Sequence, residues 1–433
     1  MASSVLGIRD FRLLWLGQSV SAVGDSVFPV AVAVRVLDEG GTASDLGLVL
    51  AARTLSFVLL LVVGGIVADR LRRTRVMLGA DALRAVTGIA LALTPGSMPI
   101  LALAGLTFAM GSGEAFFRPA YGAVVPTVVP AERLPSANGV TSVSLNSAHI
   151  IGPALAGLIV ATVGWRWAFA VDGATFLVSM ATLVRIREPR HEATEARSSA
   201  FRDALGGFRA VRERPWILAV LLYFSVLLMV AMAPLSVLRP VIAADRLGDR
   251  AVLGALLAAF GAGAVVGGVV GTRWRPRRPG VAAMTGLLPT ALVLVGYAHS
   301  RSLILLIALE FAGGVGIEIF QINWISAVQR DVPRHLLARV VSLDWMMSLG
   351  LMPIGFALTG PVVEAVGQRP VLLAGAVVVV LGVTILVVPG LADFRTPGRP
   401  DDADREPGAP FETNETAAIL AEPGALPAAD TPG

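Results

Sequence analysis

Cysteine and lysine are both missing from this chain of 433 residues, so all 35 of its basic residues are arginines. Without cysteine there can be no disulfide, no thiolate metal site and no cysteine nucleophile. Without lysine there can be no lysine Schiff base and no P-loop lysine to bind ATP phosphates. Metal ligands are also scarce, because the four histidines are isolated from one another. We therefore expect neither a metal ion nor a cofactor.

Charge is scarce as well. Only 15% of the residues are charged and 55% are hydrophobic, with a mean hydropathy of +0.74, which is typical of a membrane protein. Because a helix needs roughly 20 apolar residues to cross a bilayer, the apolar runs between Gly/Pro breakers and charge clusters predict twelve transmembrane helices. The expected spans cover residues 12–37, 44–68, 77–95, 99–125, 139–164, 166–185, 216–241, 251–272, 281–299, 302–328, 338–364 and 369–391.

The two halves of the chain repeat one another at a fixed offset of 203 residues. Seven of the 13 positions in 63–75 are identical in 266–278, and three of these seven are arginines. Four glycine pairs keep the same spacing, namely Gly111 with Gly314, Gly113 with Gly316, Gly157 with Gly360 and Gly164 with Gly367. A membrane chain duplicated in this way is an architecture used chiefly by transporters.

The even number of spans in each repeat predicts that both repeats enter the membrane from the same side. We therefore expect an all-α membrane protein with two parallel six-helix bundles, at 1–185 and 216–392. The basic segment 186–215 has apolar residues at helical spacing, which predicts an amphipathic linker helix at the cytoplasmic surface. The tail at 393–433 is rich in Pro, Ala, Asp and Glu, and we expect it to be disordered and cytoplasmic.

The arginines are distributed unevenly between the two sides of the membrane. Before the first span and in the loops after even-numbered spans there are 22, against about 6 in or beside the opposite loops. Because cytoplasmic loops carry the excess of basic residues, both termini are expected to face the cytoplasm. Arginines in short loops between apolar runs set membrane orientation, so we expect a lipid bilayer as partner and no nucleic acid.

A charged motif closes the second span, with Gly65 followed by Asp69, Arg70, Arg73 and Arg75. Small residues at such a helix end let a neighbouring helix approach closely. An aspartate at the membrane rim can face a helix N-terminus or pair with an arginine across the bundle. These residues are therefore candidates for a conformational latch; the alternative is an orientation signal with an incidental aspartate.

This motif resembles the loop signature of the major facilitator superfamily, Gly-x-x-x-Asp-Arg-x-Gly-Arg-Arg. Arg72 stands where that family usually has glycine, a variant similar to the drug and siderophore exporter branch that includes enterobactin exporters and macrolide efflux proteins. The segments 117–120 and 130–138 also resemble that branch. In the fifth span, Gly152, Pro153 and Gly157 resemble a motif associated with antiporters and join the expected latch. The second-half loop departs from the signature, because Thr272 replaces the aspartate.

The resemblance implies a transporter of the bacterial inner membrane, not an enzyme, that exports a hydrophobic or amphipathic small molecule by proton antiport. The protein would alternate between two conformations around a site near the membrane midplane. Protons and a small-molecule substrate are the expected partners, and we expect a monomer. The alternatives are a proton-coupled importer, a polytopic membrane enzyme acting on lipid-linked substrates, and a scaffold or receptor.

Charges inside the apolar spans are the candidates for proton coupling, because a charge in hydrocarbon is costly unless it has a function. Asp25 lies in the middle of the first span, with no basic residue in that span before Arg35, so we expect an unpaired acid whose neutral form is favoured. The alternative is a hydrogen-bonded structural aspartate at a helix break. Glu318 is expected to lie deepest among the acids of the second half, and His149 titrates near neutral pH when unperturbed.

Glu114 and Arg118 are four residues apart on the fourth span, so they should face one another. Either they neutralise each other, or Glu114 exchanges protons while Arg118 contacts the substrate. Asn146, Gln321 and Asn323 are the other candidates for lining the substrate cavity. Two further acids, Asp172 and Asp344, lie near the ends of expected spans, where helix capping or interfacial solvation is expected instead.

Overall fold

The computed structural model describes most of the chain as helix, with no strand among the residues it describes. These residues are 5–94, 96, 98–188, 211–247, 252–274, 276–388 and 391. Most of the expected linker and the whole of the expected tail lie outside them, so those two predictions are not addressed by the structure.

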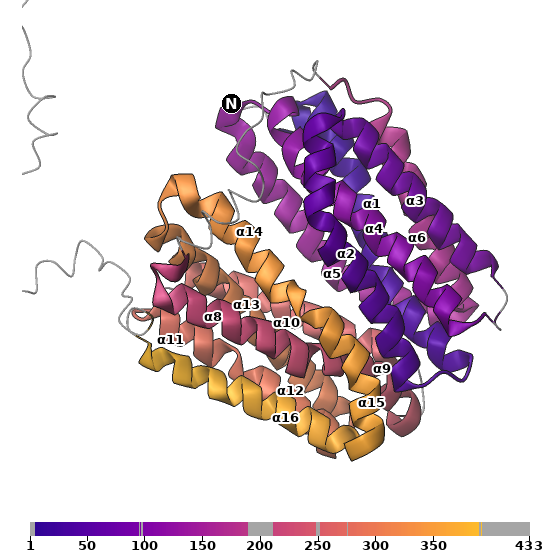
Figure 1. Ribbon diagram of the computed structural model, residues 1–433, viewed down its shortest axis with the longest axis vertical. Coiled ribbons are helices and arrows are strands. Elements are labelled where there is room, and N and C mark those ends of the chain that lie inside the picture. Colours follow the sequence, from indigo (N-terminus) through magenta and orange to yellow (C-terminus); the bar gives the residue numbers. More distant parts are fainter. Residues whose placement is uncertain are drawn as a thin grey trace, which may run out of the picture. The chain divides into compact units, whose positions relative to one another are not determined.

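The first half contains six long helices, drawn in indigo to magenta in Figure 1. They are α1 (Arg9–Asp38), α2 (Ala43–Arg70), α3 (Arg73–Leu93), α4 (Ile100–Val128), α5 (Leu134–Val163) and α6 (Trp165–Leu183). Helix α1 packs between α5 and α6, while α4 packs against both α2 and α3. At the start of α2, the side chains of Thr42 and Asp45 form a capping box that satisfies otherwise unpaired backbone N–H groups.

The second half also contains six membrane-length segments, although three of them are broken. Their helices are α8 (Pro215–Leu227), α9 (Ala233–Leu247), α10 (Val252–Arg273), α11 (Pro279–Gly286), α12 (Leu288–His299), α13 (Leu303–Asp331), α14 (Arg334–Gly350), α15 (Met352–Val366) and α16 (Gln368–Leu381). A π-helical turn joins α8 to α9. The breaks before α12 and α15 come just before Pro289 and Pro353, because proline has no N–H to continue the helical hydrogen bonding.

The predicted arrangement of spans is therefore confirmed at the level of fold. Among the described residues, ten helices are long and apolar enough to cross a membrane. The two remaining expected spans correspond to α5 and α6, helices of 30 and 19 residues that pack against α1 like their neighbours. Helix α6 carries Arg166 and Asp172, which lower the mean hydropathy of a short helix.

The internal repeat is visible in the backbone. Gly164 joins α5 to α6 with φ 89° and ψ 166°, and Gly367 joins α15 to α16 with φ 86° and ψ 165°. Side-chain-bearing residues rarely adopt positive φ, so glycine is required at this turn in each half. The two turns lie 203 residues apart in the sequence and have the same shape.

The halves meet through small residues on two pairs of helices, α2 with α15 and α5 with α10. Gly360 of α15 lies directly against the backbone of Ser44, whose hydroxyl donates a hydrogen bond of 2.5 Å to Glu364. On the other side, a Cβ at Gly254 of α10 would lie 2.6 Å from the Cα of Gly157. Because Gly157 and Gly360 are repeat partners, the same position of each half touches the other half. We call these two contacts the glycine seam.

Candidate functional site

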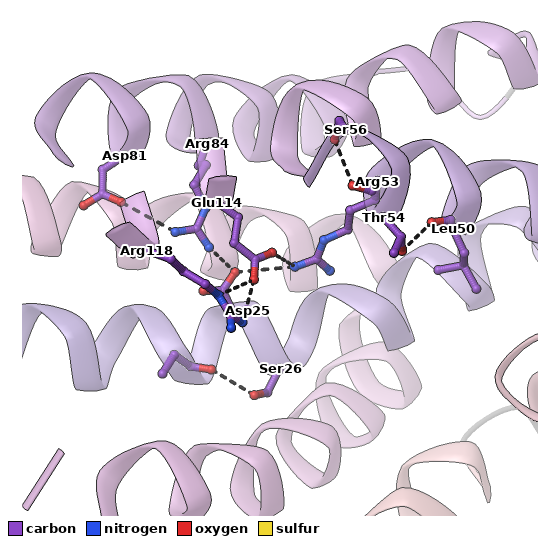
Figure 2. Close-up of polar contacts among 11 residues, drawn as sticks. Asp25, Ser26, Leu50, Arg53, Thr54, Ser56, Asp81, Arg84, Glu114 and Arg118 are labelled. Atoms are coloured by element: carbon purple, nitrogen blue, oxygen red, sulfur yellow. Dashed lines mark hydrogen bonds and ion pairs between the residues drawn. The ribbon is translucent and has the colours of Figure 1, made fainter. Parts of the chain in front are cut away.

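Asp25 is the centre of a charged cluster inside the first half, built by helices α1 to α4 (Figure 2). The Nη2 atom of Arg84, on α3, donates a hydrogen bond to Asp25 Oδ1. The Nη2 atom of Arg53, on α2, lies 3.7 Å from the same oxygen. The expectation that Asp25 is unpaired is therefore wrong, because neighbouring helices supply the arginines that its own helix lacks.

Arg53 also joins Asp25 to the pair predicted on α4. Its Nη2 atom lies 3.3 Å from Glu114 Oε2, and Arg118 Nη2 lies 2.7 Å from Glu114 Oε1. The predicted Glu114–Arg118 contact is thus confirmed as an i,i+4 ion pair. The side chain of Arg118 is 53% exposed and is the most accessible member of the cluster.

Two acids extend the cluster into the dry interior of the half. Asp81 has no solvent exposure and its Oδ1 lies 3.7 Å from Arg84 Nη1. Asp172, on α6, is equally buried. It lies beside Gly24, the residue before Asp25, because a Cβ at Gly24 would be 2.8 Å from Asp172 Oδ1. Neither carboxylate oxygen of Asp172 has a hydrogen-bond partner among the described residues. The expectation that Asp172 caps a span end is wrong, since it lies in the middle of α6.

Aromatic rings hold the arginines of the cluster in place. The guanidinium of Arg84 lies 4.0 Å from the centre of the Phe176 ring, and that of Arg53 lies 4.7 Å from the centre of the Phe28 ring. Such cation–π contacts stabilise a positive charge that has been removed from water. The rings of Phe28 and Phe176 therefore help to hold Arg53 and Arg84 beside the carboxylates.

Among the side chains that the structure describes in this cluster, carboxyl groups outnumber guanidinium groups. The acids are Asp25, Asp81, Glu114 and Asp172, and the bases are Arg53, Arg84 and Arg118. An uncompensated negative charge in a dry interior is costly. One bound proton would balance the charges, so the arrangement is suited to binding and releasing a proton.

Sequence reasoning missed Arg53, Asp81 and Arg84. All three are charged residues inside apolar runs, which is the signal that selected Asp25. Arg53 and Arg84 lie about ten residues from the ends of α2 and α3, too far for ordinary interfacial anchors.

The second half holds a smaller and closed charge site. Arg239 Nε lies 2.7 Å from Glu310 Oε1, and the hydroxyl of Tyr297 donates a hydrogen bond of 2.7 Å to the same oxygen. Glu310 has no solvent exposure, whereas Glu318 is partly exposed beside Gly267 and Gly268. Glu310 is thus the more buried acid of α13, although Glu318 lies nearer the middle of that helix, as expected. Within the described part of the chain, Glu318 has no hydrogen bond or ion pair.

The remaining candidates for the substrate cavity separate into different places. Gln321 borders a pocket between α8, α13 and α14. The side-chain amide of Asn323 instead donates to the backbone oxygen of Ile319 at 2.8 Å, within its own helix. The side chains of Asn146 and His149 lie outside the described residues. Asp344, expected near a span end, lies inside α14 and lines the same pocket as Gln321.

The expected latch residues occupy two separate regions. Asp69, Arg70 and Arg75 are exposed where α2 passes into α3, and Arg73 Nη1 donates a hydrogen bond of 2.9 Å to the backbone oxygen of Ala123. Gly65 is beside open space. The close approach to α4 is made by the adjacent Gly64, which lies against the backbone of Ala115.

The second latch region is α5. Gly152 packs on Ser26 of α1, while Pro153 and Gly157 lie against Gly254 of α10, in the glycine seam. Sequence reasoning missed Glu188, which follows α6. Its carboxylate accepts hydrogen bonds of 3.1 Å from the backbone N–H groups of Arg73 and Thr74, and so caps the start of α3.

Residues 2–422 match the sequence profile of a family described as transmembrane secretion effector. The match covers nearly the whole chain, including every helix that carries the charge cluster. The chain belongs to this family of major facilitator transporters. As a secretion effector it is a transporter and not an enzyme, so the alternative of a lipid-processing membrane enzyme is set aside.

Similar proteins are efflux pumps of bacteria. The secretion effector is 24% identical to macrolide efflux protein A of Streptococcus pyogenes, over 86% of this chain and 94% of the relative. It is 27% identical to the multidrug efflux pump Tap of Mycolicibacterium fortuitum, over 90% and 98%. It is 26% identical to the enterobactin exporter EntS of Escherichia coli, over 87% and 91%. These relatives support export of a small molecule by a multi-span bacterial membrane protein.

Solved structures support the same fold. The secretion effector superposes on a mutant of the nucleoside transporter NupG with a TM-score of 0.70 and 13% identity, covering 86% of this chain and 98% of that one. A bacterial homologue of the human lysosomal transporter Spinster gives a TM-score of 0.69 at 16% identity, covering 89% and 96%.

Proposed function

We propose that this transporter exports an amphipathic small molecule across the bacterial inner membrane in exchange for protons. Macrolides, multiple drugs and enterobactin are the cargoes in the names of its relatives, which supports a cargo of this kind. The observation that carries proton exchange is the cluster around Asp25, with one more carboxyl group than guanidinium groups.

Asp25 is the member of the cluster best suited to pass protons. Its side chain is 26% exposed, whereas Asp81 and Asp172 have no exposure. A proton on Asp25 weakens its contacts with Arg53 and Arg84, and a lost proton restores them. Each proton that moves inward releases roughly 2.3 kcal/mol per 100 mV of membrane potential, which is enough to drive export against a concentration gradient.

The conformational change would be a rocking of the two halves over the glycine seam. Small residues at both contacts let the backbones of the two halves move past one another, because no large side chains interlock there. Asp69 and the arginines beside it would bias one end state over the other. The proton affinity of the cluster needs to differ only by a modest factor between the two conformations for the proton gradient to drive the cycle.

The test uses proteoliposomes with an imposed pH gradient. Asp25→Asn mimics the protonated state, so we expect it to lose gradient-driven transport and to retain counterflow between two cargo pools. Asp10→Asn, on the same helix but outside the cluster, is the matched control and should transport normally. Glu114→Gln should also weaken cargo binding or folding, because it releases Arg118.

If Asp25→Asn keeps gradient-driven transport at the wild-type rate, Asp25 does not carry the proton, and Glu114, His149 or Glu318 becomes the candidate. Transport by the unmodified protein that ignores the pH gradient would reject proton coupling altogether. Accumulation of cargo in the direction opposite to efflux would favour the importer.

A further inference from the structure

The second half contains a pocket of about 230 Å³ between α8, α13 and α14, away from the charge cluster of the first half. These three helices lie together in Figure 1, and α14 also contacts α2 of the first half. The side chains that matter at this pocket are Phe224, Phe320, Gln321, Trp324, Asp344 and Ser348.

One wall of the pocket is a stack of aromatic rings. The ring centres of Phe224 and Phe320 are 5.0 Å apart and their planes differ by 10°, while Phe320 and Trp324 are 6.4 Å apart with planes differing by 5°. The face of an aromatic ring carries negative partial charge. Such a wall attracts both flat apolar groups and organic cations.

Asp344 supplies a carboxylate beside this wall. Trp324 Nε1 donates a hydrogen bond of 3.0 Å to Asp344 Oδ2, and the hydroxyl of Ser348 donates one of 3.1 Å to Oδ1. Both oxygens are therefore fixed by neutral donors. Among the described residues, no arginine forms an ion pair with Asp344.

The surroundings of Asp344 differ from those of the other carboxylates of the spans. Asp25, Glu114 and Glu310 each face at least one arginine within the bundle. Asp172 is sealed from solvent, and Glu318 is not among the residues that line the pocket. Asp344 alone of these acids combines a pocket, an aromatic wall and neutral donors.

We propose that this pocket binds the cationic group of an amphipathic organic cation, such as a substituted amine or quaternary ammonium. The positive charge would face Asp344, and an attached ring or alkyl group would lie against Phe224 and Phe320. Ligand pockets that enclose a whole drug-sized molecule have volumes of about 300–1,000 Å³. The smaller volume here suits one end of a cargo. The role of the pocket in holding cargo rests on the proposed export function, whereas the binding of a cation at Asp344 does not.

A purely structural role for Asp344 makes a different prediction, and the chain contains a matched control. Trp216 Nε1 donates a hydrogen bond of 3.1 Å to Asp331 Oδ2, the same type of contact, outside the pocket. Asp331 already has a basic partner, because Arg214 Nε lies 3.3 Å from its carboxylate. If tryptophan–aspartate bonds serve only to join helices, the two acids should respond alike to substitution.

The experiment measures equilibrium binding of benzyltrimethylammonium to the full chain in nanodiscs of uncharged lipid, with empty nanodiscs as the blank. The neutral probe is neopentylbenzene, in which carbon replaces the charged nitrogen. We expect the cation to bind more tightly than the neutral probe. Asp344→Asn should weaken cation binding roughly tenfold to a hundredfold, the range for losing a charge-assisted contact.

Two further variants protect the test against misfolding. Phe224→Leu removes part of the aromatic wall but leaves Asp344 untouched, and should weaken binding of both probes. Asp331→Asn should leave both affinities within about twofold of the unmodified protein. Equal affinity for the two probes, or equal losses in Asp344→Asn and Asp331→Asn, would reject the cation site.

The transport assay with the pH gradient separates this inference from the proposed function. A protein that exports cargo but does not bind the cation at Asp344 would reject the pocket alone. A protein that binds the cation through Asp344 but shows no gradient-driven transport would reject the proton-driven exporter and leave the binding site intact.

Discussion

The two halves of this transporter share their backbone plan but not their charges. At the repeat offset, Asp25 corresponds to Leu228, and Arg84 corresponds to Leu287. Glu114 corresponds to Ile317 in the same way. Among the described residues of the second half, an ion pair with a fully buried glutamate lies elsewhere, between Arg239 and Glu310. The comparison teaches that, among the described residues, the charge cluster around Asp25 belongs to the first half and was not repeated at the matching positions of the second.

The packing of the halves also differs by about one helical turn. Gly111 of α4 lies against the backbone of Arg53, while its repeat partner Gly314 lies against the backbone of Phe260. Phe260 is the repeat partner of Phe57, four residues beyond Arg53. Because 3.6 residues make one turn, the contact that α10 makes with α13 is shifted by about one turn from the contact that α2 makes with α4. The position equivalent to Arg53 has thereby moved out of the equivalent contact.

The largest expected effect distinguishes the Arg239–Glu310 pair of the second half from the charge cluster around Asp25 in the first half. Arg239→Leu leaves Glu310 charged and buried, so the free energy of unfolding should fall by about 3–5 kcal/mol. The double variant with Glu310→Leu should recover most of this loss. Arg84→Leu should cost a similar amount, but Asp25→Asn should recover only part of it, because Asp81 still faces the missing arginine. Thermal unfolding in detergent measures all four, and full recovery in the Arg84 pair would contradict the cluster.

The next effect concerns the glycine seam, where the halves are alike. Gly254→Val and Gly360→Val both force a side chain onto the backbone of the opposite half, so each should cost about 1–3 kcal/mol and stop transport. Gly105→Val, which faces open space on α4, is the control and should transport normally. Transport rates and melting temperatures of the three variants give the comparison. A seam that tolerates one substitution but not the other would show that the halves are not equivalent there.

A smaller effect is expected at the charged loop after α2. Asp69→Asn should slow transport roughly five- to tenfold, as expected for the loss of about 1 kcal/mol of coupling between states, with normal abundance in the membrane. Thr272→Asp places an aspartate at the matching position of the second half and should not restore the rate. Initial rates per molecule of protein are the measurement. Unchanged transport in Asp69→Asn would reduce the loop to an orientation signal.

The smallest effect is expected from four single-cysteine variants, which should keep their transport activity and differ only in which side of the membrane labels them. Parallel halves predict that Leu71→Cys and Arg277→Cys face the cytoplasm, while Gly96→Cys and Arg301→Cys face outward. An impermeant thiol reagent added to intact cells should label only the second pair, and the absence of native cysteine keeps the background low. Thr74 is unsuitable as a labelling site because it is buried and bonded to Glu188. Labelling of Leu71→Cys in intact cells would reverse the predicted orientation.

The fold could be predicted from the sequence because spans, breakers and a repeat are local signals. The Glu114–Arg118 pair was predictable for the same reason, since both residues belong to one helix face. The partners of Asp25 were not, because Arg53 and Arg84 reach it from other helices and only the packing brings them together. Asp344 and Asp172 were misjudged because their expected depth came from span boundaries, whereas their burial is decided by neighbouring helices.

The glycine seam has a consequence for how the two copies of the duplicated unit could evolve. After a duplication each copy can drift, and Asp25, Arg84 and Glu114 of the charge cluster have no charged counterpart in the second half. Gly360 was not equally free, because a larger residue there would collide with the backbone of Ser44 in the other copy, and its repeat partner Gly157 lies against Gly254 of the other copy. A glycine that packs against the other copy is constrained in this way, while positions that face inward become available for new chemistry. Glycine is accordingly found at this position of the seam in both copies, whereas the residues it meets, Ser44 and Gly254, correspond to Leu247 and Ala51 in the other copy.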